Sequence, residues 1–170
     1  GVNVPSKAFG EFVEHTYDTP RIPATELKRM MDEGENMVVL DSRPMSEYHA
    51  MNIPMGVDVP GAELALRVHD LAPDPETTVV VNCAGRTRSI IGCQSLKNAG
   101  IPNKVVALEN GTMGWHLAGF DLEYGNTRKY GELTGDGLRK AQACAAHVRE
   151  RFGVETIDAV TLAEWQTEKG

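Results

Sequence analysis

Apolar runs and amphipathic segments alternate along the first two thirds of the chain. Short runs, each largely apolar, lie near residues 37–41, 78–82 and 104–108. Uninterrupted apolar runs of this length are typical of strands buried on both faces of a sheet. The segments between them carry apolar residues at helical spacing. The alternation therefore predicts an open, mostly parallel central sheet with helices on both faces, a three-layer α/β/α fold.

Helices are predicted where apolar residues recur every three to four positions, and several of these segments end at a glycine. The predicted helical segments are 22–31, 45–50, 61–66, 89–99, 111–119 and 138–152. Residues 1–20 show no clear period and contain Pro5, Gly10 and Pro20. Proline and glycine interrupt regular structure, so an extended arm is predicted there.

The same pattern divides the chain into four parts. They are an N-terminal arm or linker (1–20), an α/β domain (21–124), a linker followed by a helix (125–155) and the start of a second repeat (156–170). The last part is suggested by a sequence pattern that occurs twice. Residues 157–165 repeat the Ile-x-Ala-x-x-Leu spacing of residues 22–30, at an offset of 135 residues. A repeat at a fixed offset indicates a second copy of a structural unit. The alternative is a C-terminal helix that packs back on the one domain.

Candidate chemistry is concentrated in residues 79–92. Three valines run into Asn82 and Cys83, and the next residues carry Arg86 and Arg88 with almost nothing apolar. A helix follows, for which Ser89 is the predicted N-cap. Ligands of open α/β sheets bind at the carboxyl ends of the strands, where Cys83 is expected. Backbone N–H groups and a helix N-terminus there favour a thiolate and hold an anionic substrate group.

Composition narrows the classes of partner. The chain has 170 residues and a formal net charge of −7, which argues against a general affinity for nucleic acid or for anionic membranes. Arg86 and Arg88 form a local positive island in this acidic chain. No apolar run approaches the roughly 20 residues that span a bilayer, so no membrane segment is expected.

Three cysteines are too few for a disulfide framework and are not spaced as a zinc site. We therefore expect a reducing, cytoplasmic compartment and no metal or other cofactor. Cys93 and Cys144 lie in helical segments and are read as small core residues. A redox pair of Cys83 with Cys93 is disfavoured, because more than one helical turn separates Cys93 from the loop.

Two chemistries suit a thiolate beneath an anion-binding loop: sulfur transfer through a cysteine persulfide and phosphate-ester hydrolysis through a phosphocysteine. Loop length separates them. Cysteine phosphatases use Cys-x5-Arg, in which the arginine clamps the phosphoryl group. Here the sixth position after Cys83 is Ser89, and the arginines stand at the third and fifth positions. The shorter ring favours a sulfane sulfur.

Residues 22–122 resemble a rhodanese-like domain. The resemblance rests on Leu40-Asp41-Ser42-Arg43 with Glu47-Tyr48, on Ile53-Pro54-Met55-Gly56, on residues 79–83 with their six-residue loop, and on Gly111 with Trp115 and Ala118-Gly119-Phe120. It implies an α/β sheet fold and a thiosulfate:cyanide type of sulfurtransferase activity. The incomplete second repeat suggested at the C-terminus also fits the tandem arrangements seen in this family. The chain has Met51-Asn52 where members often have Gly-His, and Thr112 and Arg86 where many have glycine. The first two differences are read as changes at packing positions.

The resemblance also implies roles for individual residues. Cys83 is the sulfur carrier, and the backbone amides of Ala84, Gly85, Arg86, Thr87 and Arg88 hold the persulfide. Asp41 and Arg43 are read as a structural pair that supports the loop. The expected partners are a small thiosulfate-like donor, a cyanide or thiol acceptor, and neighbouring rhodanese repeats. A non-catalytic sensor or interaction module remains the alternative, followed by a cysteine phosphatase-like enzyme.

Overall fold

A five-stranded, all-parallel sheet forms the centre of the structure, a computed structural model that describes residues 4–168. The strand order is β1–β5–β4–β2–β3. The strands are β1 (Arg21–Ile22), β2 (Met37–Asp41), β3 (Val57–Asp58), β4 (Thr78–Asn82) and β5 (Val105–Leu108). The three predicted strands are confirmed as β2, β4 and β5. The sequence did not predict β1 and β3, because two residues are too few to show a period.

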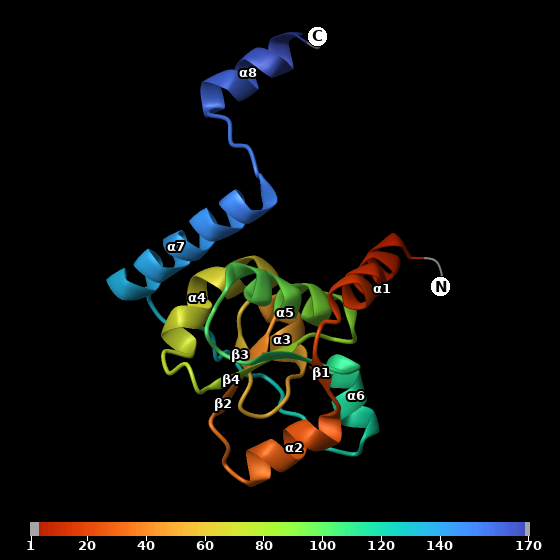
Figure 1. Ribbon diagram of the computed structural model, residues 1–170. Coiled ribbons are helices and arrows are strands. Elements are labelled where there is room, and N and C mark those ends of the chain that lie inside the picture. The colour runs from red at the N-terminus through yellow and green to blue at the C-terminus, as the bar shows by residue number, and fades with distance from the viewer. Residues whose placement is uncertain (1–3, 169–170) are drawn as a thin grey trace.

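Helices cover both faces of the sheet, as predicted (Figure 1). The main covering helices are α2 (Ala24–Asp32), α4 (Leu64–Leu71), α5 (Thr87–Ala99) and α6 (Gly111–Leu117). Successive strand residues point to opposite faces. Val80 therefore packs with Leu27 of α2 and Trp115 of α6, whereas Val81 packs with the core residues of α4 and α5. Between β2 and α4 lie α3 (Met45–Ala50), β3 and the 3₁₀ turn η1 (Gly61–Glu63).

The N-terminal segment is not the extended arm that the sequence predicted. Residues Pro5–Tyr17 form helix α1, which lies against α5. Pro5 occupies the first turn, where its missing N–H costs no hydrogen bond. Gly10 is the point of close approach: a Cβ there would lie 3.0 Å from Cγ2 of Thr87. Pro5 is therefore compatible with a helix, and Gly10 allows the helix to pack closely on α5.

The C-terminal part contains two helices, α7 (Gly135–Phe152) and α8 (Ala159–Glu168). α7 confirms the predicted helix and packs on α4, and Thr134 caps its N-terminus by accepting a hydrogen bond from the Gly137 amide. α8 has no buried residue and stands away from the sheet domain (Figure 1). A helix that packs back on the domain is therefore not what the structure shows. The division into four parts stays a prediction.

The stretch before α7, predicted as a free linker, is partly bound to the domain. The Asp58 amide donates to the Arg128 carbonyl (2.9 Å), and the Gly125 amide donates to the His49 carbonyl (2.8 Å). This stretch therefore extends along the β3 edge. Among residues 4–168, no helix is long and apolar enough to cross a membrane.

Candidate active site

Cys83 lies where strand β4 ends and the turn into α5 begins. Its side chain is buried, and its Sγ lies 3.5 Å from Oγ of Ser89, whose hydroxyl donates to the carbonyl of Arg86 (2.9 Å). Ser89 is not the N-cap that the sequence predicted, because α5 already begins at Thr87. Its hydroxyl instead faces the thiol from the first turn of the helix.

The backbone around the thiol offers unsatisfied donors. In the described part of the chain, the N–H groups of residues 84–89 find no hydrogen-bond acceptor. The first turn of a helix leaves such groups free, and the helix dipole places partial positive charge there. Ala84, Gly85, Arg86, Thr87 and Arg88 were the predicted substrate-binding residues, and their amides lie in this row. The arrangement suits an anion bound at the sulfur.

The loop rests on the start of α6. The amide and the hydroxyl of Thr112 both donate to the Cys83 carbonyl, at 2.8 and 3.2 Å, and the Met113 amide donates to the Ala84 carbonyl at 3.1 Å. Gly111 has a φ of +54°, and a Cβ there would lie 2.3 Å from the Cys83 carbonyl oxygen. Only glycine allows this approach. The sequence reading treated Thr112 as a packing position and so missed its contact with the catalytic candidate.

A buried polar row runs across the strand ends beneath the loop. Asp41 is in register with Asp58 on one side and Asn82 on the other. Asn82 Nδ2 donates to Oδ2 of Asp41 (3.1 Å) and to Oγ1 of Thr112 (3.0 Å). Asp41 also pairs with Arg43, whose Nε and Nη2 lie 2.9 and 2.8 Å from its two carboxylate oxygens. Hydrogen bonds thus connect this ion pair to the Cys83 carbonyl.

Asp58 is the least satisfied member of this row. It is buried, and its Oδ1 has no hydrogen-bond partner among the described residues. Burial, and then the negative charge of Asp41, raise the pKa of Asp58 to about 6. Arg43 and Lys129 oppose this increase through their positive charge. The candidate site therefore has a carboxyl group that titrates near neutral pH.

Arg86 and Arg88, the predicted positive island, each pair with a carboxylate in the structure. Nη1 and Nη2 of Arg88 each lie 2.8 Å from an oxygen of Glu47 in α3, and Arg86 pairs with Glu14 in α1. The hydrogen bond from Arg88 lowers the pKa of Glu47. Burial alone would raise the pKa of Glu14, but hydrogen bonds from Arg86 and Arg21 hold it below its ordinary value. The loop arginines therefore do not act as uncompensated cations.

The comparison that decides the family concerns residues 23–118, which match the family model described as the rhodanese-like domain. The chain belongs to the rhodanese-like family. The five-stranded parallel sheet with helices on both faces agrees with this assignment.

Three relatives of this rhodanese-like chain are similar over different lengths. A crystal structure of thiosulfate sulfurtransferase from Pseudomonas aeruginosa has a TM-score of 0.93 and 56% identity, over 97% of this chain and 31% of that chain. The HTH-type transcriptional regulator Rv0324 of Mycobacterium tuberculosis is 32% identical over 65% of this chain and 48% of its own length. "Putative sulfur carrier protein YrkF" of Bacillus subtilis is 28% identical over 60% and 54%. The chain spans about half the length of the curated relatives it matches.

The other two cysteines of the rhodanese-like chain do not share the environment of Cys83. Cys93 is buried in α5, and burial raises the pKa of its thiol to about 12. Cys144 in α7 lies 3.7 Å from Nε2 of His69, and burial raises the pKa of its thiol as well. Within residues 4–168, no group of three or more His, Cys, Asp or Glu side chains could hold a metal ion.

Proposed function

We propose that this chain is a sulfurtransferase that carries sulfane sulfur as a persulfide on Cys83. One observation carries the proposal: Cys83 is buried at the start of a loop whose backbone N–H groups, at residues 84–89, have no acceptor in the described protein. A persulfide anion needs such donors. The names of the Pseudomonas aeruginosa and Bacillus subtilis relatives, which refer to sulfur transfer and sulfur carriage, support it.

The reaction has two half-steps. The Cys83 thiolate attacks the outer sulfur of thiosulfate, a new sulfur–sulfur bond forms on Sγ, and sulfite leaves with the electron pair of the broken bond. A thiophilic acceptor, cyanide or a thiolate, then attacks the outer sulfur of the persulfide and releases the Cys83 thiolate. Neither step as written transfers a proton, because a thiolate or cyanide is the attacking species, so the scheme contains no general base.

The loop residues have separate tasks in this scheme. The amides of Ala84 to Arg88 hold the charge of the donor and of the persulfide, and Arg86 or Arg88 holds the departing sulfite. Each of these arginines must then share its guanidinium between substrate and the carboxylate it binds, Glu14 or Glu47. The Asp41–Arg43 ion pair acts as structural support through Asn82 and Thr112. Three free cysteines fit a reducing compartment such as the cytoplasm.

Thiocyanate formation from thiosulfate and cyanide tests the proposal. We expect turnover by the wild-type chain and a loss of at least about 1,000-fold in Cys83→Ser, because the serine hydroxyl is not ionised at neutral pH. Cys144→Ser is the matched control and should keep activity within about twofold. Turnover that survives in Cys83→Ser would contradict the proposal. A wild-type chain inactive with both thiosulfate and mercaptopyruvate would favour a non-catalytic binding module instead.

A further inference from the structure

A small charged pocket of about 190 Å³ lies at the carboxyl end of β5, and its lining includes Arg86 of the Cys83 loop. Strands β5 and β4 are neighbours in the sheet, with Val81 in register with Ala107. Cys83 and Glu109, which lines the pocket, each follow two residues later. Open parallel sheets bind their ligands along this edge. The pocket and the sulfur carrier therefore lie at neighbouring strand ends.

Two further contacts place the pocket beside the reacting sulfur. The Sγ of Cys83 lies 3.5 Å from Oγ of Ser89, and the next residue of α5, Ile90, lines the pocket. Asn110 also lines it, and the residue after that is Gly111, which makes the close approach to the Cys83 carbonyl. A molecule in the pocket is thus held against the same loop that carries the sulfur.

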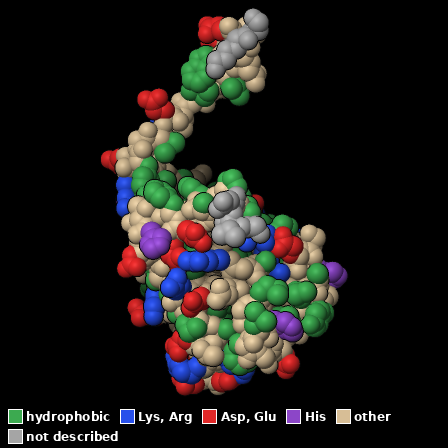
Figure 2. All heavy atoms as spheres, turned by 90° about the vertical axis from the view of Figure 1, so that its right-hand side faces the viewer, with side chains coloured by type: hydrophobic (Ala, Val, Ile, Leu, Met, Phe, Trp, Pro, Cys, Tyr) green, Lys and Arg blue, Asp and Glu red, His purple; other side chains and the backbone are tan. Residues whose placement is uncertain are grey.

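The pocket contains four charged side chains, two of each sign. Glu14 binds both arginines: its Oε1 lies 2.6 Å from Nη1 of Arg21, and its Oε2 pairs with Nη2 of Arg86. One carboxylate is therefore shared by two guanidiniums, each of which has further N–H donors. Glu109 is half-buried and acts on Arg21 through its charge, but it pairs with no cation in the described part of the chain. Positive and negative side chains lie side by side on the face of the molecule that carries α1 (Figure 2).

These charges suit a ligand that is itself both positive and negative. The spare guanidinium N–H groups of Arg21 and Arg86 can donate to a carboxylate, and Glu109 can accept hydrogen bonds from an ammonium group. A simple anion would leave Glu109 unused, and a simple cation would face two arginines. The volume is below the roughly 300–1,000 Å³ of pockets for drug-sized ligands, so the ligand is about as large as one amino acid.

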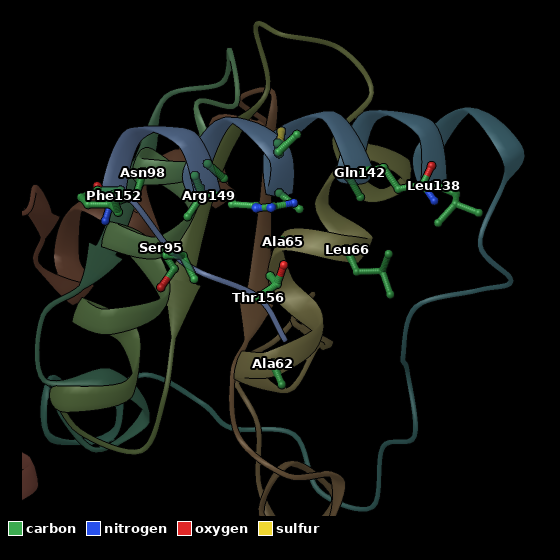
Figure 3. Close-up of a pocket in the computed structure, with 17 residues that line it drawn as sticks. Ala62, Ala65, Leu66, Ser95, Asn98, Leu138, Gln142, Arg149, Phe152 and Thr156 are labelled. Carbon is green, nitrogen blue, oxygen red and sulfur yellow. The ribbon is translucent and has the colours of Figure 1, made fainter. Parts of the chain in front are cut away.

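A larger groove between α7, α4 and α5 does not suit such a ligand. It has a volume of about 980 Å³, and among the described residues that line it Arg149 alone is charged. Figure 3 shows α7 crossing above Ala65 and Leu66 of α4 and Ser95 of α5. The groove therefore follows the C-terminal half of α5, whereas the Cys83 loop lies at the N-terminus of that helix.

We propose that the 190 Å³ pocket binds the α-amino-acid group of a small thiol, such as free cysteine, that accepts sulfur from Cys83. The inference rests on the proposed sulfurtransferase function and specifies its acceptor. The acceptor thiolate attacks the outer sulfur of the Cys83 persulfide, and a new sulfur–sulfur bond forms. The old bond breaks, its electron pair returns to Cys83 as a thiolate, and the acceptor leaves as a persulfide. Because sulfite has left before the acceptor binds, Arg86 can contact the two molecules in turn.

Binding of S-methylcysteine tests the pocket alone, because this thioether has the α-amino-acid group but cannot accept sulfur. Calorimetry should give a Kd of about 1 mM for the wild-type chain and a Kd about tenfold higher for Glu109→Gln. Glu76→Gln removes the same charge in the exposed loop before β4 and should bind as the wild type does. Failure of the wild type to bind, or equal affinity in Glu109→Gln, would overturn the proposal.

Discharge of the persulfide tests the transfer step. The Cys83 persulfide is formed with thiosulfate, and its loss is followed by intact mass after addition of cysteine, 3-mercaptopropionate or cysteamine at equal thiolate concentration. In the wild type, cysteine should react at least about tenfold faster than either analogue, which lacks the ammonium or the carboxylate group. In Glu109→Gln, the preference over 3-mercaptopropionate should fall to about twofold, whereas the preference over cysteamine should remain.

The two measurements separate this proposal from the sulfurtransferase function. A persulfide that forms and is then discharged equally fast by all three thiols would overturn the acceptor pocket and leave the carrier function of Cys83 intact. A chain that forms no persulfide would instead contradict the sulfurtransferase function, and with it the role of the pocket as an acceptor site, even if S-methylcysteine binds.

Discussion

Arg88 and Glu47 form a bidentate ion pair at the mouth of the Cys83 loop, with both nitrogen–oxygen distances at 2.8 Å. The pair joins the first turn of α5 to α3, two elements separated by 41 residues in the sequence. Because the guanidinium is already bound to a carboxylate, its charge is only partly available to an anionic donor. The strength of donor binding therefore depends on Glu47 as well as on Arg88.

Neutralising Glu47 should improve the binding of an anionic donor. In Glu47→Gln the positive charge of Arg88 is no longer compensated, so we expect the KM for thiosulfate to fall about fivefold, or ~1 kcal/mol, at low salt. Unfolding in urea should show a stability loss of less than about 1 kcal/mol, because the pair is partly exposed. Glu76→Gln, in an exposed loop at the opposite end of β4, is the control. A higher KM in Glu47→Gln would show that Arg88 does not meet the donor.

Replacing Arg88 by lysine separates charge from shape. Lysine keeps the positive charge but has no planar fork, and a fork can bind Glu47 and a sulfonate oxygen together. We expect kcat/KM with thiosulfate to fall about tenfold in Arg88→Lys, which corresponds to ~1.4 kcal/mol. Steady-state kinetics at fixed ionic strength measure the effect. An unchanged kcat/KM would remove Arg88 from the donor site.

Gly111 should tolerate no side chain. Its positive φ is unfavourable for alanine, and the added Cβ would collide with the Cys83 carbonyl, so we expect Gly111→Ala to cost at least about 3 kcal/mol. Gly119 also has a positive φ, of +83°, but has open space around its Cβ position. Gly119→Ala should therefore cost only about 1 kcal/mol. Urea unfolding of both variants separates the cost of the positive φ from the cost of the collision. Equal losses of stability in the two variants would contradict the close contact seen at Gly111.

Asp58 should make stability depend on pH. Its pKa in the folded protein is about 6, above the ordinary value of 3.8, so the folded state binds the proton more tightly than the unfolded chain. The resulting stability is complete below about pH 4 and is lost as the pH rises through about 6. Asp58→Asn removes the ionisation. The stability of the variant relative to wild type should therefore increase by about 2 kcal/mol between pH 4 and pH 7.5 in urea unfolding. A difference that is the same at both pH values would contradict this account.

The sequence predicted those parts of the fold that depend on local pattern. Val79, Val80 and Val81 form a continuous apolar run, so β4 and the position of Cys83 at its end could be predicted. Helix α1 could not, because its regularity depends on packing against α5, and Gly10 reads as a breaker until Thr87 is known to lie beside it. Ser89 was assigned to the wrong role for a related reason. Helix α5 begins at Thr87, so Ser89 lies in its first turn and not at its N-cap.

The surroundings of the candidate site were harder to predict than its loop. Glu14 lies 72 residues from Arg86, and Glu47 lies 41 residues from Arg88. No local pattern marks either carboxylate as a partner of the loop, because the fold alone brings α1 and α3 to it. Thr112 had a weak signal, since it follows the Asn-Gly pair that opens α6 near a strand end.

Intact mass measurement tests the central claim most directly. The wild-type chain and Cys83→Ser are incubated with thiosulfate and then with cyanide. The account predicts a gain of about 32 Da, one sulfur atom, in the wild-type chain alone, and its complete reversal by cyanide. A gain of the same size in Cys83→Ser, or a wild-type mass that stays unchanged with every sulfur donor, would contradict a persulfide carried by Cys83.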